Sequence, residues 1–212
     1  KAQEYWTIEG VFAKSGSEFP VKLHKIDGAS LEKFDVPNDA AAKVITDALA
    51  SAKPIVASVE RKSVRRSPPP PFTTSTLQQD ANRRLGFSAR KTMTLAQKLY
   101  EGLELGGRES TGLITYMRTD SVNLSQKFLG DTQTHLKTLG DQYATGTRAY
   151  KTKSKGAQEA HEAIRPTEVS VTPEEAKPHI EPDMAKLYDL IWRRAVASQM
   201  PDAELDATTL DS

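Results

Sequence analysis

Alternating apolar and polar positions dominate the first third of the chain and predict a β-rich region with one helix. The alternation indicates strands at residues 4–14, 21–26 and 55–64. Residues 15–17, Ser-Gly-Ser, predict the turn of a hairpin between the first two strands. Residues 39–52 are rich in alanine, begin at an Asn38 or Asp39 cap and stop before Pro54, which predicts a helix.

Four consecutive prolines at residues 68–71 separate this region from a helical one. Each proline lacks an N–H and fixes φ, so the run predicts a stiff, extended connector between two structural units. Beyond it, apolar spacing predicts amphipathic helices at residues 73–85, 88–105, 125–139 and 183–199. Residues 113–117 predict a short strand or extended segment, and the polar residues 141–158 predict a mobile loop. The last dozen residues resemble the start of a strand without a partner.

Capping residues, glycines and prolines predict where several of these helices begin and end. Ser88 is predicted to cap the helix over residues 88–105, and Gly106-Gly107 to end it. Its apolar stripe is predicted to consist of Met93, Ala96, Tyr100 and Leu103. Pro173 and Pro182 each predict the opening of a helix, because proline suits the first helical turn.

The composition is that of an ordinary soluble globular protein, with 37% hydrophobic and 27% charged residues among 212. This length suffices for one large or two small domains. No apolar run approaches the length of a membrane span, and no signal-peptide pattern opens the chain. The absence of cysteine excludes a disulfide framework, a thiolate nucleophile and a cysteine-based zinc site. A cytoplasmic location fits these features.

The net charge of +1 conceals a segregation of charge along the chain. Residues 60–91 hold eight basic and two acidic side chains, whereas residues 168–212 hold four basic and ten acidic ones. Residues 1–52 are also slightly acidic. A basic middle between acidic flanks indicates either a localised footprint for a polyanion or a solvated charged face.

Tyr116 and Arg118 are the first candidates for chemistry. A phenol, with a pKa of about 10, becomes a useful nucleophile when a cation stabilises its phenolate or a base removes its proton. Side chains two residues apart on an extended backbone share a face, so one phosphate can meet both the phenol and the guanidinium. A Tyr-x-Arg pair alone more often belongs to an amphipathic surface strand than to an active site.

Two further clusters have both a functional and an ordinary interpretation. Residues 158–167 include His161, which can titrate near neutral pH, and Arg165, which can hold a phosphate; both also suit a plain surface. Residues 72–87 place hydroxyls at a helix start and arginines at its end, which fits either a phosphate contact or a capped helix. The sequence contains no Walker loop, no dinucleotide fingerprint and no Asp-x-Asp magnesium pair.

Three blocks in the right order resemble the bacterial type IA DNA topoisomerases. They are PFTTSTLQQDANRRLGF with SARKTMTLAQKLYEG, then GLITYMRTDSVNLS, then AQEAHEAIRPT, and the match continues in LYDLIWRRAVASQM. The resemblance is dense over residues 53–200 and thinner outside them. The matching blocks surround Tyr116, and they favour the catalytic interpretation that the Tyr-x-Arg pair alone does not decide.

The resemblance implies that Tyr116 attacks a DNA phosphodiester, leaving a 5′-phosphotyrosyl link and a free 3′-hydroxyl. A second strand passes through the gap, the break is resealed and negative supercoils relax without ATP. Arg118 is implied to contact the scissile phosphate, with His161 in the active-site region and Arg165 beside it. The predicted DNA-binding residues are Ser75, Gln78, Arg83, Arg84, Arg118, Thr119 and Arg165.

The implied architecture is an α+β multidomain protein. A β-rich arch domain (residues 1–67 and 201–212) carries an inserted, mainly helical domain (residues 68–200) with the catalytic tyrosine. The family also has a Toprim domain that binds Mg²⁺, and no metal site is predicted in this chain. The chain is therefore expected to be a central fragment, inactive alone, whose partners are the Toprim domain and single-stranded segments of underwound DNA in the nucleoid.

Two rival functions explain part of the sequence. A non-catalytic DNA-binding module would use the basic residues 60–91 as its footprint and leave residues 112–121 unexplained. A tyrosine recombinase or tyrosine phosphodiesterase would also use Tyr, Arg and His, but the surrounding blocks resemble neither.

Overall fold

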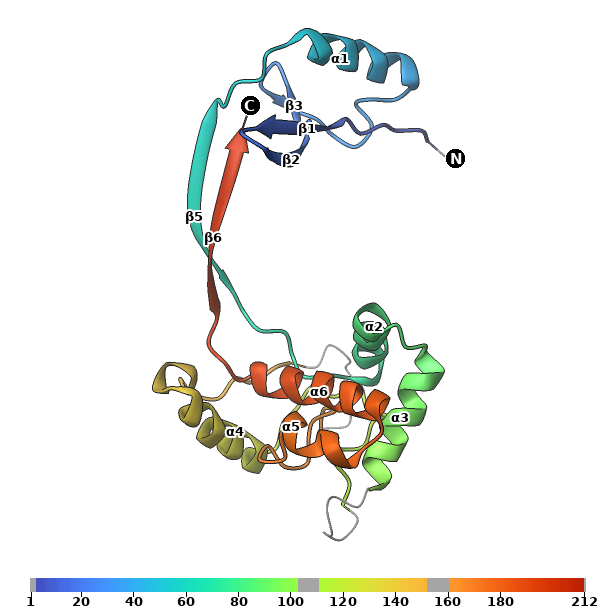
Figure 1. Cartoon of the computed structure of the whole chain (residues 1–212), viewed down its shortest axis with the longest axis vertical. Helices are drawn as coiled ribbons and strands as arrows, with labels where there is room; N and C mark the ends of the chain where they lie inside the picture. Colours follow the sequence, from blue (N-terminus) through green and yellow to red (C-terminus); the bar gives the residue numbers. More distant parts are fainter. Residues whose placement is uncertain (1–2, 103–110, 152–160, 212) are drawn as a thin grey trace. The chain divides into compact units, whose positions relative to one another are not determined.

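The computed structural model describes residues 3–102, 111–151 and 161–211 and divides into two compact units. Unit 1 comprises Lys1–Arg61 and Thr208–Ser212, and unit 2 comprises Lys62–Ala207. Both helices and strands are present (Figure 1), so the predicted α+β class is confirmed.

Two short hairpins open unit 1: β1 (Glu9–Lys14) with β2 (Ser17–Lys22), and β3 (Lys25–Ile26) with β4 (Ala29–Ser30). The turn of the first hairpin consists of Ser15 and Gly16, both at positive φ (52° and 80°). Such a two-residue turn matches the twist of antiparallel strands. The second strand therefore begins at Ser17, earlier than predicted, because the turn is shorter than the Ser-Gly-Ser sequence suggests.

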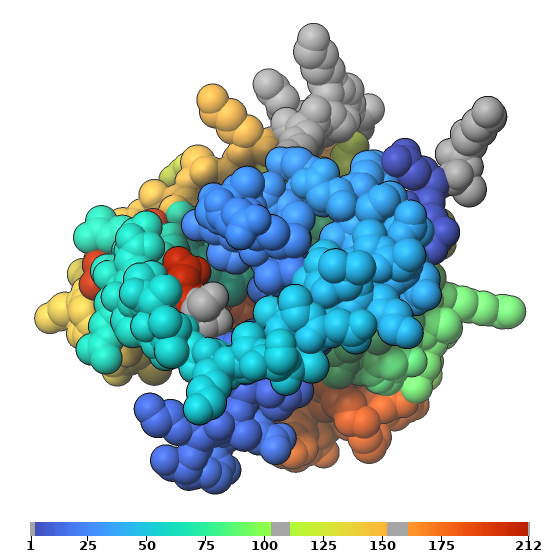
Figure 2. All heavy atoms as spheres, turned by 90° about the horizontal axis from the view of Figure 1, so that it is seen from above, coloured from blue at the N-terminus to red at the C-terminus, as the bar shows by residue number. Residues whose placement is uncertain are grey.

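Helix α1 (Asp39–Ser51) confirms the predicted helix and its cap, since the Asn38 side chain accepts a hydrogen bond from the Ala41 N–H at 2.9 Å. Figure 2 shows α1 (light blue) at the surface of the molecule. Among the described residues of unit 1, the buried apolar side chains are those of Val36 and Ala42. Unit 1 thus has a very small core.

Strands β5 (Ser58–Arg66) and β6 (Ala203–Asp211) form a two-stranded ribbon. β5 starts later than the alternation predicted, and the expectation that the last strand has no partner is wrong, because β6 pairs with β5. The division into compact units crosses this ribbon at Arg61 and Ala207. The sequence placed the domain boundaries at residues 67 and 200, and that assignment of domains stays a prediction.

The four prolines lie within unit 2 and pack against its helices. Tyr150 donates its hydroxyl hydrogen towards the carbonyls of Pro68 (3.0 Å) and Ser198 (2.8 Å), and burial raises the pKa of the Tyr150 phenol. Arg194 contacts the carbonyl of Pro70. The run is extended, as predicted, but its carbonyls bind neighbouring side chains, so it does not act as a free connector.

Unit 2 contains helices whose capping follows from the sequence. They are α2 (Thr74–Leu85), α3 (Ala89–Glu101), α4 (Gln126–Leu139), α5 (Pro173–Ala176) and α6 (Pro182–Ala197), with short 3₁₀ turns η1 (Asp141–Tyr143) and η2 (Lys177–His179). Thr73, Ser88 and Ser125 each accept a backbone N–H at the helix start. Helix α3 ends at Glu101 with Gly102 at φ 107°, earlier than predicted, and Gly106-Gly107 lies outside the described residues.

The main core of unit 2 lies among α2, α3 and α6. Phe72, Leu77, Leu99, Tyr188 and Ile191 are fully buried there. A smaller core joins α4 to the end of α6, and its members are Phe128, Leu136, Val169, Ala195 and Val196. No helix in the described ranges is long and apolar enough to cross a membrane.

The buried face of α3 differs from the predicted one. It consists of Thr92, Leu95, Ala96 and Leu99, which follow the i, i+3, i+4, i+7 spacing of one helical face. Tyr100 is 40% exposed, and Leu103 lies outside the described residues. The predicted stripe is confirmed at Ala96, and Met93 packs partly buried against the core, but the prediction is wrong at Tyr100.

Candidate active site

The segment that carries Tyr116 is held on two sides by backbone hydrogen bonds. On one side Leu113 N–H donates to the carbonyl of Leu99, at the end of α3, at 2.7 Å. On the other side Thr115 N–H donates to the Arg165 carbonyl (2.9 Å), and Thr167 N–H donates to the Leu113 carbonyl (3.0 Å). The strand predicted for residues 113–117 does not form: the chain bends at residues 113, 115 and 117, and Ile114 alone makes an isolated bridge, with Pro166.

Burial alternates along this segment. Met117 and Thr119 are buried, with 1% and 8% of their surface exposed, whereas Tyr116, Arg118 and Asp120 are exposed. This period of two is that of an extended chain with one face on a core. Tyr116 and Arg118 therefore share the exposed side, as their spacing predicted.

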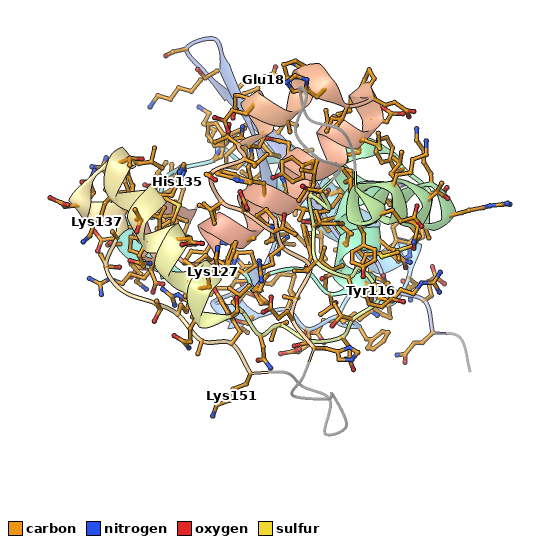
Figure 3. The ribbon with its side chains drawn as sticks, turned by 90° about the horizontal axis from the view of Figure 1, so that it is seen from below. Glu18, Tyr116, Lys127, His135, Lys137 and Lys151 are labelled. Carbon is orange, nitrogen blue, oxygen red and sulfur yellow. The ribbon has the colours of Figure 1, made fainter. Side chains whose placement is uncertain are left out.

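The Tyr116 ring packs edge to face against the Tyr100 ring, with centroids 5.3 Å apart. Figure 3 shows Tyr116 at the surface beside α3 (green). Gly112 permits the close approach of the two segments, because a Cβ at this position would lie 2.5 Å from the Tyr100 carbonyl oxygen. A side chain at residue 112 would push the Tyr116 segment away from α3.

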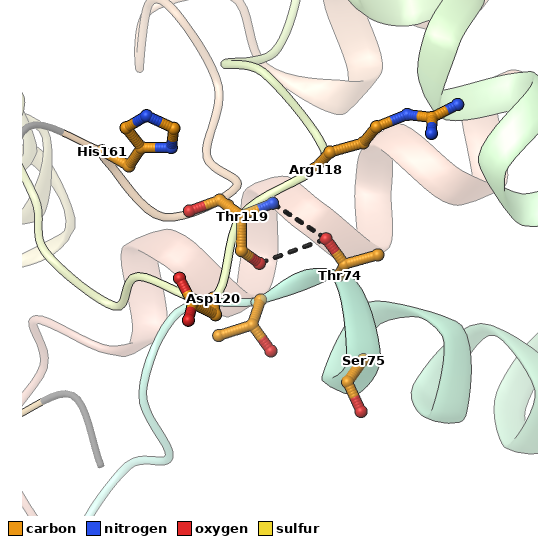
Figure 4. Close-up of a pocket in the computed structure, with 7 residues that line it drawn as sticks. Thr74, Ser75, Arg118, Thr119, Asp120 and His161 are labelled. Atoms are coloured by element: carbon orange, nitrogen blue, oxygen red, sulfur yellow. Dashed lines mark hydrogen bonds between the residues drawn. The ribbon is translucent and has the colours of Figure 1, made fainter. Parts of the chain in front are cut away.

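A hollow of about 490 Å³, which we call the first hollow, lies next to this segment (Figure 4). Its lining residues are Thr73, Thr74, Ser75, Arg118, Thr119, Asp120 and His161. The structure thus brings together predicted site residues from three separate blocks of sequence. Tyr116 is not among the lining residues, since its ring lies against Tyr100.

Reciprocal hydrogen bonds join the start of α2 to the floor of the first hollow. Thr119 N–H donates to Thr74 Oγ1 at 2.9 Å, and Thr74 N–H donates to the Thr119 carbonyl at 2.9 Å. The Thr74 hydroxyl lies 2.8 Å from the Met117 carbonyl, which it can reach as a donor. The segment that carries Tyr116 is therefore joined rigidly to the N-terminus of α2, and the buried Thr119 forms part of this connection.

Arg118 and His161 are the basic side chains in the lining of the first hollow. In Figure 4, Thr119 lies between His161 and Arg118, and the Arg118 side chain extends away from His161. The N–H groups of Thr74 and Thr76 at the start of α2 are already engaged, with the Thr119 carbonyl and Thr73 Oγ1. A guanidinium and an imidazole both suit contact with a phosphate. The carboxylate of Asp120, which also lines the first hollow, offsets part of the positive charge of Arg118.

Arg165 is held by interactions within unit 2. Its Nε donates to Glu162 Oε2 (2.6 Å), its Nη1 to the Pro166 carbonyl (2.8 Å) and its Nη2 to Ser125 Oγ (3.2 Å). The guanidinium also lies over the Phe128 ring at 4.8 Å, and the side chain is only 12% exposed. This geometry favours a structural role, and the predicted contact of Arg165 with DNA stays a prediction.

The basic residues of α2 converge on a carboxylate that the sequence reasoning overlooked. Arg83 Nη2 lies 2.5 Å from Asp80 Oδ1, Arg84 Nε lies 3.5 Å from Oδ2, and Arg194 of α6 donates to Oδ2. The spacing of three and four residues could have revealed the first two pairs. Arg194 could not be foreseen, because it comes from another helix. Gln78 is half-buried on α2.

The residues described here do not fit a magnesium site. Mg²⁺ prefers several oxygen ligands, including carboxylates. Within residues 3–102, 111–151 and 161–211, no group of three or more His, Cys, Asp or Glu side chains is close enough to hold a metal ion. No catalytic step is assigned to a metal in this chain.

Comparison with known proteins gives a consistent result. A family model described as DNA topoisomerase matches residues 1–212. The DNA topoisomerase 1 of Rickettsia felis is 48% identical over 97% of this chain and 27% of its own length, and that of Xylella fastidiosa is 46% identical over 99% and 26%. The full-length topoisomerase I of Thermotoga maritima matches with a TM-score of 0.71 and 31% identity, covering 99% of this chain and 32% of the other. The chain thus spans roughly a quarter of the length of these curated relatives.

Proposed function

This chain belongs to the bacterial type IA DNA topoisomerases, and on that premise we propose that Tyr116 is the nucleophile that cleaves one strand of DNA. The resemblance predicted from the three sequence blocks is confirmed at the level of the family. The observation that carries the proposal is that Tyr116 and Arg118 share the exposed side of a backbone fixed by hydrogen bonds, beside the first hollow.

In the proposed reaction the Tyr116 oxygen attacks a backbone phosphorus of single-stranded DNA. A bond forms between the phenolic oxygen and phosphorus, the bond from phosphorus to the 3′ oxygen breaks, and that oxygen takes up a proton as the phenol loses one. The product is a 5′-phosphotyrosyl link with a free 3′-hydroxyl. Attack by that hydroxyl reverses each change and reseals the strand, so no ATP is consumed.

Arg118 and His161 are proposed to act on the phosphate. The negative charge on the non-bridging oxygens grows towards the transition state, and a guanidinium placed beside them stabilises it. A protonated His161 would add a second positive charge across the first hollow.

The Tyr116 ring must leave Tyr100 and turn towards the first hollow before it can attack a phosphate held there. A rotation about the side-chain bonds of Tyr116 suffices in principle, because the backbone on both sides is fixed. We propose that the remaining groups of the active site, with their Mg²⁺, belong to a Toprim domain outside the sequence described here. The chain by itself is then expected to be inactive in relaxation of supercoiled DNA.

The test is covalent trapping of labelled single-stranded DNA by the full-length enzyme. Tyr116→Phe removes only the phenolic oxygen and is expected to abolish the denaturation-resistant adduct. Tyr143→Phe makes the same chemical change outside the first hollow and is expected to form the adduct at the normal level. An undiminished adduct with Tyr116→Phe would refute the assignment. If the unmodified full-length protein bound single-stranded DNA but formed no adduct, the result would favour the alternative function of a non-catalytic DNA-binding module.

A further inference from the structure

A second hollow of about 310 Å³ lies further along α2. Its lining residues are Thr76, Gln79, Asp80, Arg83 and Arg194. Helix α2 contributes the first four and α6 contributes Arg194. The proposed reaction at Tyr116 makes no use of this hollow.

The second hollow carries an excess of positive charge. Arg83, Arg84 and Arg194 surround the single carboxylate of Asp80. Asp80 is 9% exposed, so its charge is largely covered by the guanidiniums, whereas the side chains of Arg83 and Arg84 are 69% and 59% exposed. Arg83 and Arg194 line the second hollow with Asp80, so its lining holds two cations and one anion, and Arg84 adds a further cation beside it.

The buried carboxylate fixes the direction of the guanidiniums. Arg194 donates to Asp80 Oδ2 and stacks over the Phe72 ring, with its guanidinium carbon 4.4 Å from the ring centroid. Arg83 donates to Asp80 Oδ1 at 2.5 Å. A guanidinium has five N–H donors, so a bond to Asp80 leaves others for a ligand. Groups held in this way lose less entropy on binding than flexible arginines would.

A hydrogen bond connects the two hollows along one face of α2. Gln79 Nε2 in the second hollow donates to Ser75 Oγ in the first at 3.1 Å. Four residues of helix advance about 6 Å along its axis. Adjacent phosphates of a single strand are separated by a comparable distance, so one strand can place neighbouring phosphates at both hollows.

We propose that the second hollow binds a backbone phosphate of the DNA strand adjacent to the phosphate in the first hollow. The ligand class is a phosphodiester of single-stranded DNA, gripped by Arg83 and Arg194. This inference rests on the proposed function, because the first hollow must hold the neighbouring phosphate. It adds a subsite for the strand that flanks the cleavage position.

The test measures binding of a fluorescein-labelled oligothymidylate to the full-length enzyme as a function of NaCl concentration. Tyr116→Phe serves as the background, with EDTA present, so that no covalent product forms. The variants are Arg83→Gln and Arg118→Gln, one for each hollow. Arg193→Gln is the matched control, since Arg193 is an exposed arginine on α6 that pairs with Asp189 and Glu174. Thermal denaturation of each variant confirms that folding is unchanged.

The slope of log K against log salt is negative, and each lost phosphate contact reduces its magnitude by about 0.7 for a single strand. Arg83→Gln and Arg118→Gln are each expected to reduce the magnitude of the slope by about this amount, with a several-fold loss of affinity, while Arg193→Gln leaves the slope unchanged. An unchanged slope for Arg83→Gln, or an equal decrease for Arg193→Gln, would overturn the subsite. A normal slope for Arg118→Gln alone would instead count against the first hollow and the proposed function.

Discussion

Tyr116 is an exposed side chain on a fixed backbone, and its neighbours determine where its phenol points. The ring lies against Tyr100 and outside the first hollow, although the next exposed residue, Arg118, lines that hollow. Edge-to-face aromatic pairs contribute about 0.5–1.5 kcal/mol beyond the area they bury. An energy of this size can hold the ring in one rotamer and still be overcome when DNA binds.

Replacement of Tyr100 should therefore free the Tyr116 side chain. In Tyr100→Leu the aromatic contact is lost, and the Tyr116 ring is expected to populate several rotamers, whereas Tyr100→Phe keeps the ring and the single rotamer. NMR coupling constants of the Tyr116 Hβ protons measure these populations. If Tyr100→Leu left the couplings unchanged, the contact with Tyr100 would not be what orients the nucleophile.

Local spacing predicted the candidate residues, whereas their interaction partners came from distant parts of the chain. The spacing of Tyr116 and Arg118 sufficed to predict a shared face, because strand periodicity is local. Arg165 was predicted to contact DNA as Arg118 was, yet it is buried against Glu162 and Phe128. Which arginine remains exposed depends on the packing of α4, and packing between distant segments is not encoded in local spacing.

Helix starts were predicted well because capping is also local. Asn38, Thr73, Ser88 and Ser125 each accept a backbone N–H within a few residues of themselves. Strand limits were predicted less well. β2 begins where a two-residue turn ends, and β6 depends on its pairing with β5, which lies far away in sequence.

Helix α4 contains a buried hydroxyl that offers a stability test. Among the described residues, Thr132 Oγ1 is buried with no hydrogen-bond partner. Burial of an unsatisfied hydroxyl costs about 1–3 kcal/mol, and valine has nearly the same shape. Thr132→Val is expected to raise the free energy of unfolding of unit 2 by about 1 kcal/mol.

Chemical denaturation of Thr132→Val and of Thr134→Val measures this effect. Thr134 is exposed on the same helix, so its replacement serves as a control and should change stability by less than about 0.5 kcal/mol. A destabilised Thr132→Val would mean that the hydroxyl has a partner, such as a buried water.

Helices α3 and α6 are joined by a charge contact that should depend on pH. Hydrogen bonds from Lys91 and then Lys186 hold the pKa of Asp183 below its usual range. A carboxyl whose pKa is lower in the folded state stabilises the fold above its unfolded pKa of about 3.9, and this contribution is lost as the pH falls through the folded pKa. Asp183→Asn should lower the melting temperature slightly at pH 6 and converge with the unmodified protein in strong acid. Parallel melting curves at every pH would contradict the linkage.

The two compact units differ in how much apolar surface they bury. Unit 2 contains two clusters of buried side chains, whereas Val36 and Ala42 are the buried apolar residues among those described in unit 1. Local stability follows buried contact, so backbone opening should cost less in unit 1.

Hydrogen exchange measured by mass spectrometry should show this difference. Amides of β1, β2 and α1 are expected to exchange faster than those of α2, α3 and α6 in the isolated chain. Peptides from the two units that exchanged at equal rates would indicate that the chain unfolds as a single cooperative body.

The pairing of β5 with β6 has a consequence for synthesis on the ribosome. β5 leaves the exit tunnel long before β6 has been translated, because all of α2 to α6 lies between them in sequence. During that interval β5 has an unpaired edge, which in a strand is a site for aggregation. The charged side chains of Arg61, Lys62, Arg65 and Arg66 along β5 are the kind of residue that protects such an edge. These arginines and lysines thus keep the nascent chain soluble until its last strand arrives.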